Sequence, residues 1–413
     1  MDLSTFDGIE QFKQGAFDID PASLYREFEK VKDGRGKKGR RFPLPFVLTL
    51  IMLGKMAGQK KISGVIGWVK ERESELRKIF TWPRDFPVHS TYDDVLAKCD
   101  EQDLIKAIEG VIRKARAVEK SGDEPSRLVA ETQEGDNLVH RAVDGKVMRG
   151  TLKHVQEHQP SVHLVGLYEC ETGLLLAQIE VGSKENEITA GKVLLDPKYV
   201  KGCIITSDAM FSFREWCAKI HIYSGYYTTI IKDNNPAVHG ELELFFEDDG
   251  IDRSEWQYHK KVQKGHGRLE VREIWTSTQM NEYYAKDWTG SAQIFKIRRT
   301  VLEKGKERIQ IVYGITNLPR ETADAERLLE LNQKHWSVEN RLHHRRDVTL
   351  GEDSSQVRIK GALETLAVIN SGILALMDYL GVKNVASQML HFDYHYREAI
   401  QLLGMCQVEH GLS

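Results

Sequence analysis

The sequence lacks the features that hold small secreted proteins together. Its 413 residues contain only five cysteines, at positions 99, 170, 203, 217 and 406, and none forms a C-x-x-C pair. A disulfide framework or a cysteine-bound zinc site needs paired or closely spaced cysteines, so neither is expected to organise the fold. Isolated cysteines of this kind are typical of a chain that works in a reducing compartment.

Long apolar runs and an excess of one charge are missing as well. The longest apolar stretch, 42–57, contains two prolines and Lys55 and is too short to span a bilayer. The first four residues do not open a secretory signal, so we expect a soluble, cytoplasmic protein with no membrane partner. Lys and Arg number 58 against 61 Asp and Glu, a net charge of −3. This excludes a uniformly basic nucleic-acid coat but not a local basic patch.

The remaining composition is that of a globular protein. Hydrophobic residues make up 41% of the chain and charged residues 29%, and the length favours two to three domains. Residues 1–118 are predicted to form a helical domain, with a buried helix after Pro45, another over 62–80 and a capped one at 92–98. The polar segment 119–137 is predicted to be a linker.

The hydrophobic pattern changes at residue 138. The segment 138–235 predicts a mixed α/β sheet with helices on its faces. The expected elements are a strand over 138–143, a hairpin of 162–168 and 174–181, a helix over 187–195, a strand over 203–208, a helix over 211–220 and a strand over 226–231.

The segment 236–317 is predicted to be a β-rich insertion. Four alternating runs at 256–262, 268–276, 293–302 and 307–316 indicate strands, and three of them carry several Lys or Arg. The second part of the core, 318–382, is predicted to contain a helix over 322–344 capped by Asp324, followed by an apolar helix over 356–380. Residues 383–413 are interpreted as a C-terminal tail.

Three acidic residues stand at positions suited to catalysis. Asp144 and Asp208 close predicted buried strands, where the functional groups of α/β sheets gather. Glu339 lies within a predicted helix, with His343 on the same face and Arg346 on the same stripe. Three carboxylates can hold two hard divalent cations ~3.5–4 Å apart. By itself the pattern is weak, because an Asp that ends a strand is usually a turn former or a helix cap.

Five motifs follow in order along the chain: VDGKVMRG at 143–150, KENEI at 184–188, SDAM at 207–210, GHGRLEVR at 265–272 and HWSVENRLH at 335–343. In these motifs, over about residues 20–380, the sequence resembles the transposases of the H-repeat-associated insertion-sequence family. These are DDE recombinases with a ribonuclease-H-like core. The sequence departs from the family pattern at Asn235, where Gln is usual, and at His344, where Trp is usual.

The resemblance implies a ribonuclease-H-like mixed sheet with flanking helices, an N-terminal helical DNA-binding domain and a β-rich insertion between the second Asp and the Glu. It implies that Asp144, Asp208 and Glu339 are the catalytic and metal-binding residues, with two Mg²⁺ or Mn²⁺ ions. The implied partners are double-stranded DNA, as terminal inverted repeats and as target, and further copies of the chain in a dimer or higher assembly. The implied location is the cytoplasm of a bacterium, at the nucleoid.

Several basic residues are candidates for contact with DNA phosphates. They are Lys146, Arg149, Lys232, His266, Arg268, His343 and Arg346, together with Lys37, Lys38, Arg40 and Arg41 in the basic run 32–41. That run is expected to be a flexible cationic loop. Each group also has a simpler interpretation as solvated surface charge or as hairpin residues. His154 and His158 have zinc-like spacing, but the surrounding sequence is typical of a loop.

Two other functions remain open. The chain could be a nuclease that cuts DNA without joining it, or an inactive DNA-binding remnant, although an intact set of three acids favours catalysis.

Overall fold

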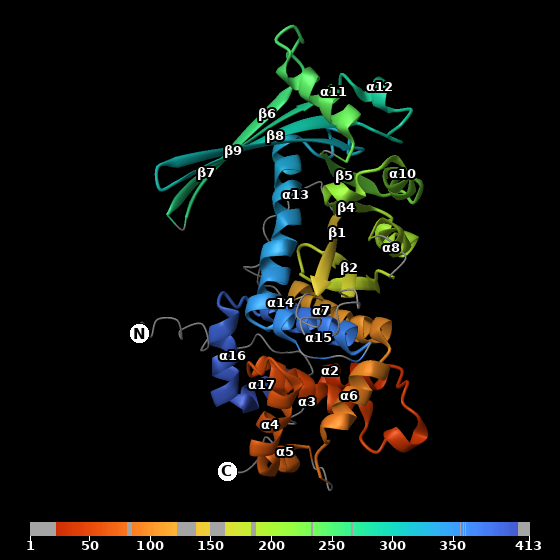
Figure 1. Ribbon diagram of the computed structural model, residues 1–413, viewed down its shortest axis with the longest axis vertical. Coiled ribbons are helices and arrows are strands. Elements are labelled where there is room, and N and C mark those ends of the chain that lie inside the picture. The colour runs from red at the N-terminus through yellow and green to blue at the C-terminus, as the bar shows by residue number, and fades with distance from the viewer. Residues whose placement is uncertain are drawn as a thin grey trace, which may run out of the picture.

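The computed structural model describes residues 22–80, 85–121, 138–148, 162–182, 187–232, 234–265, 267–355, 357, 359 and 361–403. The molecule is elongated (Figure 1). A helical body occupies one end, a sheet with flanking helices the middle, and a β arm projects sideways at the other end.

The helical body is built from the N-terminal third of the chain. Its helices are α2 (Ala22–Glu29), α3 (Leu44–Met56), α4 (Ile62–Glu71), α5 (Glu73–Ile79), α6 (His89–Lys98) and α7 (Glu101–Ser121). The predicted helix over 62–80 is interrupted at Arg72, so that α4 and α5 are separate elements. Helix α3 is buried along almost its whole length, in agreement with a sequence that is apolar except for Thr49 and Lys55.

Two helices at the end of the chain join this body. They are α16 (Val385–Tyr394) and α17 (Tyr396–Leu403), and they pack against α3. The Trp68 indole donates a hydrogen bond to Asp393 at 2.8 Å, and Arg72 lies 3.0 Å from the same carboxylate. The described part of the segment interpreted as a tail is therefore an integral part of the helical body.

The core sheet confirms the predicted α/β class. Its strands are β1 (Val139–Met148), β2 (Val162–Glu169), β3 (Leu175–Glu180), β4 (Cys203–Ser207) and β5 (Tyr226–Ile231). The strand order is β3-β2-β1-β4-β5. Strands β1, β4 and β5 are parallel, and β2 pairs antiparallel with both of its neighbours, β1 and β3. This is the arrangement expected of a ribonuclease-H-like core. Helices α8 (Glu187–Leu194), α9 (Pro197–Val200) and α10 (Arg214–Ile222) connect the strands, and the predicted helix over 211–220 begins with a separate 3₁₀ turn, Ala209–Phe211.

Strand β1 is longer than predicted. The sequence suggests an end at Asp144, but the strand continues to Met148. Its parallel pairing with β4 ends at Val143 and Ser207, while its antiparallel pairing with β2 runs on through Asp144 and Gly166 to the end of the strand. Asp144 therefore marks the end of one pairing and not the end of the strand.

The arm extends the same sheet. The four predicted strands are confirmed as β6 (Gln257–Gly265), β7 (Arg268–Ser277), β8 (Gln293–Glu303) and β9 (Lys306–Thr316). Strand β9 pairs with β5, so the arm and the core form one nine-stranded sheet with β6 at its edge. Helices α11 (Pro236–Glu247) and α12 (Asn281–Tyr284), which the sequence does not predict, lie beside the base of the arm.

The helix predicted over 322–344 changes its winding. Asp324 caps α13 (Ala325–Ser337) as predicted, accepting a 2.8 Å hydrogen bond from the backbone of Arg327. A π-helical turn, Val338–His343, then leads into α14 (His344–Val348). Such π turns are rare and are often found at functional sites, and this one contains Glu339.

Helix α15 (Ala362–Tyr379) connects the core to the helical body. By length and composition it could cross a membrane, but 94% of it is buried inside the protein. It packs against α6 and α7, so it is a core helix that joins the two parts of the molecule.

Candidate active site

The two aspartates lie side by side on neighbouring parallel strands. Val143 of β1 and Ser207, the last residue of β4, are register partners. Asp144 is the next residue of β1, and Asp208 directly follows the end of β4. The Asp144 carboxylate accepts a 2.9 Å hydrogen bond from the backbone of Gly145, and the Asp208 carboxylate a 2.7 Å bond from that of Ala209. Parallel strands are ~4.8 Å apart, so both carboxylates arise at one point of the sheet.

The helix that carries Glu339 crosses this point. Four residues before Glu339, the Nδ1 atom of His335 lies 3.0 Å from the Thr206 hydroxyl of β4. Four residues after it, the Nδ1 atom of His343 lies 3.3 Å from the Asp144 carboxylate. The backbone of Glu339 is therefore placed between contacts to both strands. The Glu339 side chain is not among those that the structure describes, so the convergence of all three carboxylates stays a prediction.

His335 and His343, the two histidines that line the site, are uncharged. Burial, with the charges of Arg346 and Lys146, holds the pKa of His343 well below its usual value. A neutral imidazole that carries its proton on Nδ1 could donate it to the Asp144 carboxylate, 3.3 Å away, and the buried Nε2 atom of His343 has no hydrogen-bond partner in the described part of the chain. Burial likewise lowers the pKa of His335 to about 4.

The donor chemistry fits divalent cations. Carboxylate oxygens are the ligands that Mg²⁺ and Mn²⁺ prefer, and Asp144 and Asp208 supply two carboxylates beside a neutral wall. Within the described ranges no group of three or more His, Cys, Asp or Glu residues forms a complete metal site. The third carboxylate would have to come from Glu339.

Lys232 brings a positive charge to the rim of the site. Its ammonium lies 3.6 Å from the Asp208 carboxylate and 6.0 Å from the ring of Trp336, a half-exposed side chain on α13. The lysine is itself partly exposed, so it can reach a bound phosphate while it stays near the acids.

Lys146 and Arg346 occupy a different environment. Both are buried, and both contact Glu352: Arg346 through two hydrogen bonds of 2.7 and 3.1 Å, and Lys146 at 3.5 Å. Lys146 also pairs with Asp347, and Arg346 with the Tyr168 hydroxyl. Their predicted contacts with phosphate stay predictions, since the structure commits both cations to carboxylates of the chain.

These side chains form one network of ion pairs next to the site. Burial alone would raise the pKa of Glu352, but the charges of Arg346 and Lys146 lower it to about 2. The charge of Glu352 in turn helps to raise the pKa of Arg346. Asn370 of α15 donates a further 3.0 Å hydrogen bond to the same carboxylate. We call the buried residues Lys146, Arg346 and Glu352, together with the partly exposed Asp347, the buried ionic cluster.

The other residues predicted to contact DNA lie farther from the candidate active site or are not among the described residues. Arg149 and His266 are outside the described residues, as are His154, His158 and the first three residues of the KENEI motif. Glu187 of that motif begins α8 and lies 3.2 Å from the His163 ring. Arg268 is exposed on the arm, 3.6 Å from Glu270.

The basic run 32–41 is a hydrogen-bonded turn and not the expected flexible loop. Arg35 is 2% exposed and bonds to Asp33 and to the backbone oxygen of Phe42, so it is part of the interior. Arg40 donates to the backbone oxygen of Asp33 at 2.6 Å. The four predicted contact residues remain on the surface: Lys37, Lys38, Arg40 and Arg41.

Asn235, which departs from the family pattern, and its neighbour Asn234 both support the site. Asn234 donates a 2.6 Å hydrogen bond to the backbone oxygen of Ala209, and Asn235 donates to that of Ser212. Both amides thus hold the turn that follows Asp208. These contacts and the contact of Thr206 with His335 could not be predicted from the sequence, because they depend on which strand ends meet.

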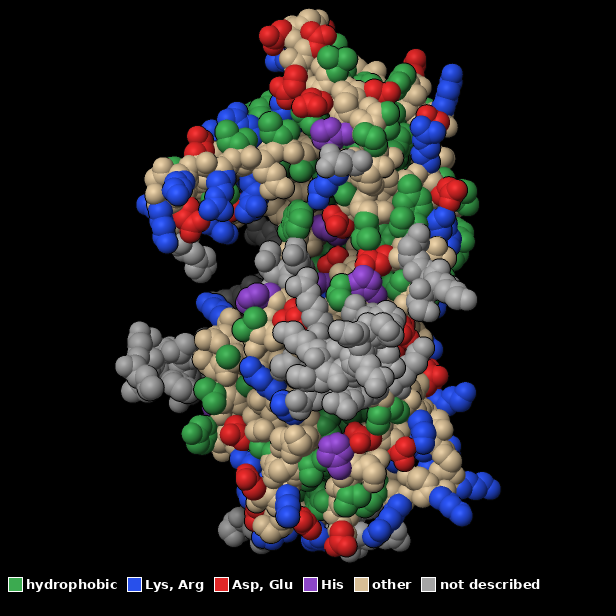
Figure 2. Space-filling model, viewed as in Figure 1, with side chains coloured by type: hydrophobic (Ala, Val, Ile, Leu, Met, Phe, Trp, Pro, Cys, Tyr) green, Lys and Arg blue, Asp and Glu red, His purple; other side chains and the backbone are tan. Residues whose placement is uncertain are grey.

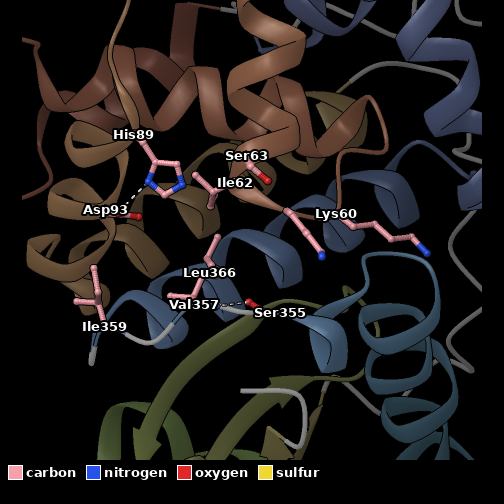
Figure 3. A pocket seen from close by; sticks show the side chains of 10 residues that line it. Lys60, Ile62, Ser63, His89, Asp93, Ser355, Val357, Ile359 and Leu366 are labelled. Atoms are coloured by element: carbon pink, nitrogen blue, oxygen red, sulfur yellow. Dashed lines mark hydrogen bonds and ion pairs between the residues drawn. The ribbon is translucent and has the colours of Figure 1, made fainter. Parts of the chain in front are cut away.

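A separate pocket lies where the helical body meets α15 (Figure 3). It has a volume of about 280 Å³ and is lined by Lys60, Lys61, Ser63, His89 and Asp93, among others. His89 and Asp93 point toward each other and form a 2.9 Å contact. Neither Asp144 nor Asp208 is among the described residues that line it, so it is distinct from the paired aspartates at the strand ends.

Comparisons with known proteins identify the family of this chain. Residues 136–376 match the family described as "Transposase DDE domain", and residues 25–110 match "DDE_Tnp_1-associated". A protein of Escherichia coli O157:H7 named "Putative transposase YncI" is 25% identical, covering 86% of this chain and 87% of its own. The "H repeat-associated putative transposase YhhI" of E. coli K12 is 28% identical, covering 55% of this chain and 61% of its own.

Among solved structures, a piggyBac transposase synaptic complex with hairpin DNA is similar, with a TM-score of 0.43 and 11% identity, covering 96% of this chain and 87% of that one. Because the match to the transposase DDE domain covers more than half of the sequence and contains both paired aspartates and the helix of Glu339, the chain belongs to the DDE transposase family.

Proposed function

We propose that this protein is the transposase of an insertion sequence. It binds the terminal inverted repeats, hydrolyses a phosphodiester at the element end, and joins the resulting 3′ hydroxyl to target DNA by in-line attack. The observation that carries the proposal is the adjacent placement of Asp144 and Asp208, with the π turn of Glu339 held over them by His335 and His343.

The carboxylates of Asp144, Asp208 and Glu339 are proposed to hold two divalent cations, Mg²⁺ or Mn²⁺, which supply activation of the attacking oxygen and stabilisation of the leaving one. His343 orients the Asp144 carboxylate through its Nδ1 proton. Lys232, beside Asp208, holds the phosphate that is cut. The buried ionic cluster anchors α14 to β1, and thereby keeps the helix of Glu339 in place.

The arm offers a path for the duplex. Register pairing places Lys261, Arg272 and Arg299 in one row, and the rows beyond it add Arg268, Lys306 and Arg308 on the same face. Nearer the core this face packs on α13, which leads to Glu339. Figure 2 shows Lys and Arg side chains gathered on the side of the arm above an open notch. We call it the basic face and propose that it binds the DNA backbone.

The test is an assay on the ends of the element. Sequencing the DNA that flanks the gene identifies the inverted repeats, and a labelled duplex carrying one end is incubated with full-length protein and Mg²⁺ or Mn²⁺, or with EDTA. The proposal expects metal-dependent cleavage at the repeat end and strand-joined products with target DNA.

Each rival function gives a different result in that assay. Cleavage without joined products would identify a nuclease, and binding without cleavage in either metal would identify an inactive DNA-binding protein. A protein that neither bound nor cut the repeat would overturn the proposal entirely. An insertion-sequence transposase acts on chromosomal DNA, so the proposed location is the bacterial cytoplasm at the nucleoid.

A further inference from the structure

The arm has a second face that the proposed function does not use. Residues that pair across antiparallel strands lie on the same face, and neighbours along a strand lie on opposite faces. Val262 pairs with Val271, and Ile309 pairs with Thr300 in the same row, while the next rows carry Ile311 on one side and Leu269 with Leu302 on the other. We call this the apolar face.

The apolar face is exposed. Val262 is 55% exposed, Ile309 50% and Ile311 42%, and Leu269, Leu302 and Tyr258 of the same face are also exposed. Near the core, α11 covers this face, where Phe246 stacks on Tyr313 at 6.0 Å and Glu247 pairs with Lys296. Beyond α11, the described part of the chain leaves these side chains open. Contiguous apolar patches of this kind mark interaction sites.

We infer that the apolar face is the interface for a second copy of this chain, packed arm against arm, sheet face to sheet face. The charges around the patch favour such self-association. Lys260, Lys264 and Arg298 share the face with Glu273 and Glu307. A two-fold axis places the same surface on both partners, and mixed signs let each cation meet an acid of the other copy.

The charge pattern of the apolar face argues against DNA as its binding partner. The basic face carries six cations against Glu270 and Glu303, whereas the apolar face is nearly balanced and has hydrophobic side chains at its centre. Strand addition at the edge is also disfavoured, because the edge strand β6 carries Lys260, Lys261 and Lys264. Lysines on an edge strand block pairing with a further strand.

The size of the face predicts when the arms pair. Four strands ~4.8 Å apart and five residues at ~3.4 Å give a flat footprint of roughly 300 Å². Stable interfaces bury about 800 Å² on each partner. Pairing of the free protein is therefore weak, and it strengthens when the basic faces hold two copies on one DNA molecule, which raises their effective concentration. This last step rests on the proposed function, whereas the interface itself does not.

The test is sedimentation velocity of the full-length protein over a hundredfold concentration range, alone and with duplex DNA that carries the inverted repeat. The variant combines Val262→Thr, Ile309→Thr and Ile311→Thr, which keep a β-branched side chain in each strand. The matched control is Val301→Thr, the same change on the basic face of β8. We expect the three-site variant to raise the dissociation constant for pairing by at least about tenfold, and the control to stay within about twofold.

The outcomes separate this inference from the proposed function. Pairing of the three-site variant equal to that of the wild type would overturn the inference, as would equal losses in variant and control. Pairing that is seen only after residues 2–21 are deleted would show that this segment covers the apolar face in the full-length chain. That result would also overturn the inference. If pairing is weakened in the variant without DNA while the wild type neither binds nor cuts DNA, the interface stands and the proposed function fails.

Discussion

Two groups of positive side chains in this protein look alike in sequence and differ completely in the structure. Lys146 and Arg346 lie behind the paired aspartates, buried and bound to Glu352. Lys306 and Arg308 lie on the basic face of the arm, exposed to solvent. A cation close to the candidate catalytic residues in sequence can thus be part of the scaffold, whereas cations far from them in sequence form the surface that is proposed to bind DNA.

The largest expected effect is on stability, from removing one member of the buried ionic cluster. Arg346→Leu leaves Glu352 charged and buried without its main partner, which costs about 3–5 kcal/mol of unfolding free energy. Arg308→Leu on the arm is the control and should change stability by less than about 0.5 kcal/mol. Urea unfolding measures both, and equal values would erase the distinction between the two groups.

The next effect is on DNA binding by the arm. Changing Arg268, Lys306 and Arg308 to Ala should flatten the slope of log affinity against log salt by up to about three units, at ~0.9 per lost phosphate contact. The matched control changes Lys260, Lys264 and Arg298 to Ala on the apolar face of the same strands. Salt titrations with a short duplex should show no change in slope for this control. If both variants flattened the slope equally, the basic face would not be the DNA-binding side of the arm.

The basic turn of the helical body should have a smaller effect. Changing Lys37, Lys38, Arg40 and Arg41 to Ala should flatten the same slope by about two units. The loss is below the four units of complete contact, because Arg40 is already held by the backbone of Asp33 and Arg35. An unchanged slope in the salt titration would confine DNA binding to the arm and the catalytic core.

The smallest effect is a pH dependence of the buried ionic cluster. The folded pKa of Glu352, about 2, is below its ordinary value of 4.5, so its ionisation contributes stability above about pH 4.5 that is lost as the pH falls toward 2. The stability difference between wild type and Glu352→Gln should therefore be constant near pH 7 and shrink below pH 4.5. A difference that did not depend on pH in acid unfolding series would contradict the depressed pKa.

The sequence was sufficient to predict much of the core. Alternating patterns predict β6 to β9, and the buried runs before Asp144 and Asp208 predict β1 and β4, because these patterns are local. The same local evidence failed at Asp144, where the strand continues because β2 pairs with it, and at α11, whose hydrophobic residues fall within a segment read as β-rich. A local sequence pattern does not show which strands pair with each other.

The candidate site shows the same limit. The acids were chosen from motifs, and the register of Val143 with Ser207 brings the two aspartate positions together, while the role of the three acids stays a prediction. The role of Glu352 could not be found from spacing, since its contact with Lys146 joins residues 206 positions apart. The π turn at Val338–His343 is likewise invisible in a sequence that has ordinary helical periodicity.

Glu339 is proposed to complete a metal-dependent site with Asp144 and Asp208, and a single substitution at this position separates catalysis from DNA binding. Full-length wild type and Glu339→Gln are measured side by side for binding and Mg²⁺-dependent cleavage of the inverted-repeat duplex. The account predicts that cleavage falls by at least about a thousandfold, or ~4 kcal/mol, while affinity for DNA is retained. Cleavage by Glu339→Gln at a rate near that of the wild type would contradict it.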